Sequence, residues 1–374
     1  KKIILEDRLS KAMESYGYRI MQTPTFEFFD VFGREIGTTP SKDLFKFFDH
    51  EGNTLVLRPD ITPSIARAAS KYFMEEKLPI KLYYRGNTFI NNDSYKGHLK
   101  EVTQIGCELI NDSSVSADAE MIMLAVASLK AAGLNDFQIS ISHAEFFKGL
   151  VDAAGLGEET KDLLHEYLLN KNYFMVDEVI SDLNVDEESK ALFSLLGGFH
   201  SDVDEIKKAR EAAGVSPVVR DAVERLIDLD NLLKIYGVDK YVSYELGNVS
   251  AHDYYTGVIF SAYTYGTGEP IISGGRYDNL IKNFGKDAPA TGFAIVVDQL
   301  MTALSRQSIA LDNDRECTLV CFVASKEKEA VLYSEELRNN GKNALLIPMI
   351  YGDDHSTYES YGKKNCCKTT VFFE

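Results

Sequence analysis

The sequence predicts an α+β fold: an antiparallel sheet with flanking helices, a helical insertion within it, and a short α/β domain at the C-terminal end. Strand patterns occur before residue 145 and return after residue 240. The residues between them have helical patterns and carry about twenty acidic against about ten basic side chains. The tail has β-α-β order, which predicts parallel strands. We therefore expect a core over residues 1–312, with the insertion at about 145–240, and a small α/β domain over residues 315–374.

Apolar spacing and turn residues predict the elements before the insertion. An apolar stripe over residues 5–16, followed by Gly17, predicts a first helix. Two short apolar runs around residues 51–53 predict a hairpin. Thr62 before Pro63 is the expected cap of a helix that ends at residue 72. The other expected elements are strands at 81–84 and 100–110, a helix at 118–132 and a strand at 137–142.

Strand patterns after the insertion are shorter. They lie at residues 241–246, 257–263 and 292–297, and Gly274-Gly275 indicates a turn. The tail predicts a strand at 318–323, a helix at 326–339 that ends before Gly341, and a strand at 344–348.

Composition excludes several classes of function. The net charge is −17 and no basic patch is present, so nucleic acid, including tRNA, is not an expected partner. No run of 18 apolar residues is present, and we expect no membrane span and no signal peptide. The five cysteines predict free thiols and a cytoplasmic location. The pair Cys366-Cys367 has no partner at zinc spacing, so no metal site is expected.

A polar pattern on one predicted strand indicates a ligand site. Gln104, Gly106 and Glu108 alternate at period 2 and therefore face the same side of the sheet. Gly106 is expected to leave open space over the sheet, in which a ligand lies between Gln104 and Glu108. An amide and a carboxylate on one face accept hydrogen bonds from an ammonium or an imidazole. The alternative is an exposed polar sheet face.

Three further clusters accompany this strand. Arg58 and Asp60 stand at a strand-to-helix junction, where Asp60 either binds a polar ligand or caps the helix. The other two are residues 253–257, with the sequence DYYTG, and residues 273–280, with the sequence SGGRYDNL. In the second, Gly-Gly permits close backbone approach to a ligand.

Taken together, the clusters resemble the catalytic core of histidyl-tRNA synthetase, a class II aminoacyl-tRNA synthetase, over residues 1–305 in the same order. Residues 23–28 resemble the dimer-forming first motif, and residues 89–108 and 292–300 resemble the second and third. DYYTG and GGRYD resemble the two histidine-specific motifs. The resemblance implies a class II sheet, and it puts Asp60 where the synthetases carry Glu.

The sequence departs from the synthetase pattern at the positions that bind ATP and activate the carboxylate. The resemblance implies arginines and a glutamate that hold the phosphates or the activated carboxylate at five positions. Because negative charge grows on phosphorus during adenylation, one such donor is worth about 10²- to 10³-fold in rate. The residues found at these positions are Ile90, Asn92, His98, Ser250 and Gln299.

Four positions that contact histidine in the synthetases are retained, in contrast: Gln104, Glu108, Tyr255 and Tyr277. Asp60, which stands where the synthetases carry Glu, is the fifth residue expected to bind histidine. This pattern is similar to the regulatory-subunit family of ATP phosphoribosyltransferase. The resemblance implies a non-catalytic protein without cofactor that binds L-histidine for feedback, activates a short-form catalytic subunit and forms a homodimer within a hetero-oligomer. Residues 315–374 resemble a shortened anticodon-binding domain.

Two other interpretations stay open at this point. One is an atypical histidyl-tRNA synthetase or related amino-acid ligase that uses other cations. The other is a synthetase-like scaffold that binds no histidine.

Overall fold

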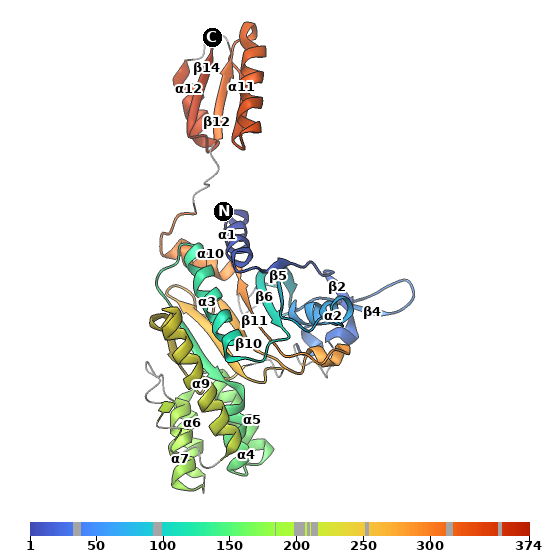
Figure 1. Ribbon diagram of the computed structural model, residues 1–374, viewed down its shortest axis with the longest axis vertical. Helices are drawn as coiled ribbons and strands as arrows, with labels where there is room; N and C mark the ends of the chain where they lie inside the picture. The colour runs from blue at the N-terminus through green and yellow to red at the C-terminus, as the bar shows by residue number, and fades with distance from the viewer. Residues whose placement is uncertain are drawn as a thin grey trace. The chain divides into compact units, whose positions relative to one another are not determined.

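The computed structural model describes residues 1–32, 39–92, 99–183, 185–197, 206–207, 210, 216–250, 254–311, 317–350 and 354–374 (Figure 1). By their contacts, the residues divide into two units, residues 2–310 and residues 311–374. The larger unit contains the expected antiparallel sheet and the helical insertion.

An eight-stranded sheet forms the centre of the larger unit. Its outer pairs, β1–β5 and β7–β8, are parallel, and the pairs between them are antiparallel. The predicted antiparallel sheet, with strands contributed from both sides of the insertion, is therefore confirmed. In spatial order the strands are β1 (Arg19–Ile20), β5 (Ile80–Phe89), β6 (Glu101–Ile110), β11 (Ala290–Val296), β10 (Ile272–Arg276), β9 (Val258–Thr264), β7 (Phe137–His143) and β8 (Val242–Tyr244).

Helices cover both faces of β5 and β6. On one face lie α1 (Lys2–Ser15), α3 (Val115–Ala131) and α10 (Val297–Arg306) (Figure 1). Tyr83 of β5 donates to Glu14 of α1 at 2.7 Å, and the Cys107 sulfur lies 3.9 Å from that of Met121 in α3. On the other face, α2 (Thr62–Tyr72) packs against Tyr84. Because side chains alternate along a strand, Glu108 shares this second face.

A small three-stranded sheet precedes α2. Its order is β2-β4-β3, with β2 at Phe26–Phe28, β3 at Lys46–Phe48 and β4 at Thr54–Leu57. Strands β3 and β4 are antiparallel, which confirms the predicted hairpin.

The insertion is helical wherever the structure describes it. After β7 come α4 (Ala144–Ala153), α5 (Glu158–Leu169), α6 (Tyr173–Asp182), α7 (Glu187–Ser194) and α9 (Pro217–Tyr236). Figure 1 shows these helices grouped at one end of the large sheet. Helix α9 packs on both α3 and α4, so it joins the insertion to the core.

The smaller unit is a three-stranded parallel sheet with one helix on each face. Its strands, in the order β13-β12-β14, are β12 (Cys317–Phe322), β13 (Asn343–Pro348) and β14 (Thr369–Phe373). Helix α11 (Glu327–Asn339) packs with the cluster that contains Val320, and α12 (His355–Lys364) with the cluster that contains Leu319. The predicted β-α-β order and its parallel pairing are confirmed, and α12 and β14 extend it.

Several local predictions were wrong. Residues 272–276 form strand β10, although Gly274-Gly275 indicated a turn. Strand β5 runs to Phe89, five residues beyond the predicted end at residue 84. Thr62 does not cap α2: it lies inside the helix, and Ile61 stands at the cap position without a side-chain hydrogen bond.

Candidate functional site

A cavity of about 150 Å³ lies over the second face of the large sheet. Its wall is built by the start of α2, by β6, β10 and β11, and by the turns that carry Tyr254, Tyr255 and Tyr277. All five residues predicted from the sequence line this one cavity, although they are spread over more than two hundred positions of the chain. They are Asp60, Gln104, Glu108, Tyr255 and Tyr277.

Glu108 is the most deeply buried acid of the cavity. Glu108 is 1% exposed, and its Oε1 accepts a hydrogen bond from Thr62 Oγ1 at 2.8 Å. Its Oε2 accepts one from the Tyr277 hydroxyl. The side chain lies over Gly292, its partner across the β6–β11 ladder. A Cβ at position 292 would overlap Oε2 of Glu108, so glycine is required there for close approach.

Burial dominates the electrostatics of Glu108. The pKa of its carboxyl group is raised from 4.5 to about 8. Desolvation is the main cause and the charge of Asp60 adds to it, while the hydrogen bonds from Tyr277 and Thr62 oppose the rise. Without a ligand, the group therefore tends to hold its proton near neutral pH. A cationic ligand would reverse this effect, because an opposite charge favours the ionised carboxylate.

Asp60 and Gln104 supply further acceptors. Oδ1 of Asp60 accepts from the backbone N–H of Ile61 at 2.7 Å, and Oδ2 accepts from the Tyr254 hydroxyl at 3.4 Å. Asp60 thus accepts a hydrogen bond from the backbone at the start of α2 and also lines the cavity. Oε1 of Gln104 is buried and has no hydrogen-bond partner among the described residues.

The space over Gly106 is occupied by the Tyr84 side chain, which corrects the expectation of an open site there. Tyr84 faces Gly106 across the β5–β6 ladder, and a Cβ at position 106 would overlap the Tyr84 hydroxyl. The residue is fully buried in the core cluster under α2. The cavity is therefore not lined by Gly106, although Gln104 and Glu108 on either side of that glycine both line it.

Sequence reasoning missed the three other lining residues with polar side chains, Thr62, Tyr254 and Ser273. Tyr254 could have been found, because it stands next to Tyr255 in DYYTG; the two rings are 4.7 Å apart. Nothing in the sequence separates Thr62 from a helix cap. Asp253 of DYYTG and His98 lie outside the described residues.

A buried ion-pair cluster supports the strand end that carries Tyr277. Arg276 donates from Nε to Oδ1 of Asp118 at 2.9 Å, and Arg225 of α9 donates from Nη2 to Oδ2 at 2.6 Å. Nη1 of Arg276 also lies 3.1 Å from Oδ1 of Asp278. One carboxylate of α3 therefore ties the GGRYD segment to the last helix of the insertion.

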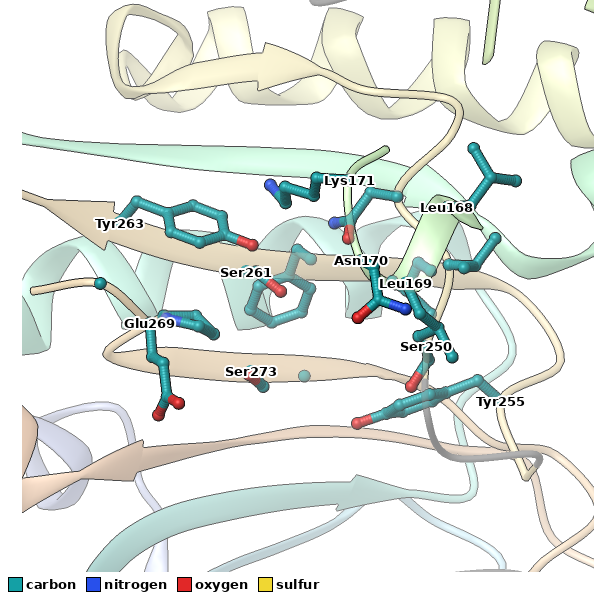
Figure 2. A pocket seen from close by; sticks show the side chains of 17 residues that line it. Leu168, Leu169, Asn170, Lys171, Ser250, Tyr255, Ser261, Tyr263, Glu269 and Ser273 are labelled. Carbon is teal, nitrogen blue, oxygen red and sulfur yellow. The ribbon is translucent and has the colours of Figure 1, made fainter. Parts of the chain in front are cut away.

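Two larger hollows adjoin the cavity. One, of about 410 Å³, shares Gln104 and Val296 with it and contains Ile90, Asn92 and Gln299. The other, of about 530 Å³, shares Tyr255 and Ser273 with it and contains Ser250 (Figure 2). Ile90, Asn92, Ser250 and Gln299 stand at positions where the resemblance implied groups that hold ATP or the activated carboxylate, and they line the two hollows and not the cavity.

The described part of the chain shows neither a metal-binding cluster nor a membrane-spanning helix. No group of three or more His, Cys, Asp or Glu side chains there is placed to hold a metal ion. None of its helices is both long and apolar enough to cross a membrane.

Comparison with known proteins gives one consistent result. The family described as Histidyl-tRNA synthetase matches residues 3–300. A relative from Acetivibrio thermocellus, named ATP phosphoribosyltransferase regulatory subunit, is 39% identical over 364 residues, covering 96% of this chain and 85% of the relative. A relative of the same name from Ruminiclostridium cellulolyticum is 37% identical over 364 residues, covering 97% and 87%.

Solved structures agree with these relatives. A Bacillus halodurans structure, titled ATP phosphoribosyltransferase regulatory subunit/histidyl-tRNA synthetase, matches with a TM-score of 0.82 and 31% identity, covering 100% of this chain and 93% of the other. A Nostoc histidyl-tRNA synthetase matches in fold, with a TM-score of 0.80 at 19% identity, over 99% and 87%. The sequence, the fold and these likenesses together establish that the chain belongs to the family of ATP phosphoribosyltransferase regulatory subunits, which has the class II histidyl-tRNA synthetase fold.

Proposed function

We propose that this chain is a non-catalytic regulatory subunit that binds L-histidine in the 150 Å³ cavity and controls a short-form ATP phosphoribosyltransferase catalytic subunit in the cytoplasm. The observation that carries the proposal is the convergence of Asp60, Gln104, Glu108, Tyr255 and Tyr277 on one cavity. Homology to proteins named as regulatory subunits supports the pairing with a catalytic partner.

The cavity suits the two nitrogen-bearing groups of histidine. A cavity of about 150 Å³ accepts a molecule the size of benzene, which is close to the size of an imidazole ring. The tyrosine rings offer an aromatic wall, and Tyr254 and Tyr277 meet edge to face at 5.8 Å between centroids. The carboxyl groups of Asp60 and Glu108 and the amide oxygen of Gln104 accept hydrogen bonds from an ammonium and an imidazole N–H.

Histidine binding is tested with Glu108→Ala. A buried charge that loses its partner costs about 3–5 kcal/mol, so the affinity for histidine should fall more than about a hundredfold. The complex with the catalytic subunit should still assemble and stay active, but it should resist inhibition by histidine, because a subunit that cannot bind the effector cannot transmit it. Calorimetry on the chain and inhibition assays on the reconstituted complex measure these effects.

Glu101→Ala is the matched control, since Glu101 lies on the same strand and is exposed. It should bind histidine as the wild type does. Unchanged inhibition in a correctly assembled Glu108→Ala complex would show that the effector site lies elsewhere. Wild-type protein that binds no histidine would favour the scaffold interpretation.

The absence of adenylation is the second part of the proposal. Of the described side chains that line the 410 Å³ hollow, Lys100 is the single cation, and Glu269 and Asp298 line it as well. Lys100 donates to Oδ1 of Asn91 at 3.1 Å. A triphosphate would meet net negative charge in this hollow, and charge stabilisation in the transition state would be lost.

We therefore expect no histidine-dependent exchange between ATP and pyrophosphate and no charging of tRNA. Exchange clearly above a blank without histidine would instead support the alternative, an atypical histidyl-tRNA synthetase or amino-acid ligase.

The proposal includes a homodimer of this chain, which the small sheet β2-β4-β3 supports. Phe26, Phe28 and Phe47 lie on one face of this sheet, because Phe28 and Phe47 both pair with Leu55 and Phe26 is two residues from Phe28. They are 51%, 55% and 37% exposed. Three exposed aromatic rings on one sheet face form an apolar patch of the kind that a second chain covers.

A further inference from the structure

The described polar groups that line the cavity are mostly hydrogen-bond acceptors. Asp60 and Glu108 contribute carboxyl groups, and Oε1 of Gln104 is buried without a partner among the described residues. Of the five hydroxyl groups of the described wall, three already donate to these acids: Thr62 and Tyr277 to Glu108, and Tyr254 to Asp60. A ligand that donates hydrogen bonds therefore suits the acceptors of this wall.

No described residue of the cavity wall carries a positive side chain. In the neighbouring 530 Å³ hollow, the described wall includes one cation, Lys171, which Figure 2 places across the hollow from Tyr255. Nζ of Lys171 lies 3.3 Å from Oε1 of Glu245, a residue that is 3% exposed, and 4.5 Å from the centre of the Tyr263 ring. The charge of Lys171 is therefore already paired within the protein.

We propose that the cavity recognises its ligand by the amine and the imidazole and does not read the carboxylate. This inference rests on the proposed function and names the ligand class of that site: primary amines that bear an imidazole. An α-carboxylate gains no cationic partner here and is repelled by Asp60 and by Glu108 once that group ionises, because like charges in a partly buried site destabilise each other. An amino alcohol or amine of the same shape avoids that repulsion.

Calorimetry on the full chain with four ligands tests the inference. L-histidine has all three groups, L-histidinol carries CH2OH in place of the carboxylate, histamine lacks the carboxylate, and imidazole lactate carries a hydroxyl in place of the amine. We expect L-histidinol and histamine to bind within about threefold of L-histidine, or more tightly. Imidazole lactate should bind more than about a hundredfold more weakly, because the buried carboxyl groups lose their cation.

A second arm uses Lys171→Gln, with Lys148→Gln as the control, since Lys148 is an exposed cation on α4 outside both the cavity and the 530 Å³ hollow. Both variants should bind L-histidine as the wild type does. L-histidine that binds tenfold or more tightly than L-histidinol would overturn the inference while leaving the proposed function intact. If Lys171→Gln also removed that preference, Lys171 would be the group that reads the carboxylate. If none of the four ligands bound, the proposed histidine site itself would be wrong.

Discussion

Arg276 donates from Nε to Oδ1 of Asp118 at 2.9 Å, at the residue immediately before Tyr277. Tyr277 in turn donates its hydroxyl hydrogen to Glu108. Asp118, the buried acid of α3, is thus linked to Glu108 in the cavity through the neighbouring residues Arg276 and Tyr277. Arg225 of α9 shares that carboxylate, so the helical insertion and the cavity wall are anchored on one side chain.

Asp118→Asn should be strongly destabilising. The substitution leaves two arginines without their shared carboxylate, and Arg276 is buried. Removal of one partner of a buried ion pair costs about 3–5 kcal/mol. Urea unfolding should show a loss of this size. Histidine affinity should also fall, because Tyr277 follows the arginine that loses its anchor.

Asp287→Asn is the control for this prediction. Its side chain is 78% exposed and its ion pair with Lys282 spans 3.9 Å. An exposed pair is worth about 0–1 kcal/mol, so this variant should unfold close to the wild type. Equal stability of the Asp118 and Asp287 variants would contradict the structural role of the cluster.

Glu108 should make stability depend on pH in a defined window. Its folded-state pKa of about 8 exceeds the ordinary value of 4.5. The folded protein therefore holds this proton more tightly than the unfolded chain does, and the contribution to stability is complete below about pH 4.5 and lost as pH rises to about 8. Glu108→Gln lacks this titration. Its free energy of unfolding, relative to that of the wild type, should therefore rise by up to about 1.4 kcal/mol for each pH unit in that window.

The measurement is the free energy of unfolding of both proteins between about pH 5 and pH 8, in steps of about one pH unit. Glu101→Gln serves as the control, because this exposed residue lies on the same strand. Parallel stability curves for wild type and Glu108→Gln would show that the carboxyl group is not desolvated as described.

Gly292→Ala should displace Glu108. The new methyl group would overlap Oε2 of Glu108 and lie 2.5 Å from the carbonyl oxygen of Cys107. Overpacking of a core costs about 1–3 kcal/mol, and the displaced carboxyl group can no longer meet a ligand in the same geometry. Calorimetry should show histidine binding weakened about tenfold or more.

Gly157→Ala is the matched control, because a Cβ at position 157 meets no atom within 4 Å. It should leave histidine affinity unchanged. A Gly292→Ala protein with wild-type affinity would indicate that the position of Glu108 does not determine binding.

The exposed phenylalanines should hold the homodimer together. Replacing Phe26 and Phe28 with Ser removes two large apolar side chains from the exposed face of the small sheet, each worth about 1.5–3 kcal/mol when buried. Sedimentation of the chain without its partner should shift from dimer toward monomer. Phe174→Ser on α6 is the control, since Phe174 is 69% exposed and lies outside this sheet. Wild-type protein that is monomeric at micromolar concentration would contradict the assignment.

Local sequence rules predicted much of the architecture and part of the site. Period-2 alternation placed Gln104 and Glu108 on one face, and both line the cavity. The switch from strand to helix patterns near residue 145 predicted the insertion, and β-α-β order predicted the parallel tail. Strand β10 was missed because two successive glycines have low strand propensity, which packing within the sheet overrides.

The sequence by itself determined which chemical groups are available: an amide, two acids and tyrosines in segments whose spacing indicates strand faces and turns. Only the tertiary structure decided which space these groups enclose. Tyr84 fills the place over Gly106, Thr62 binds Glu108 instead of capping its helix, and Gly292 leaves room for that carboxyl group. Each of these contacts joins segments far apart in the chain, so each depends on strand register and helix packing, which local periodicity does not encode.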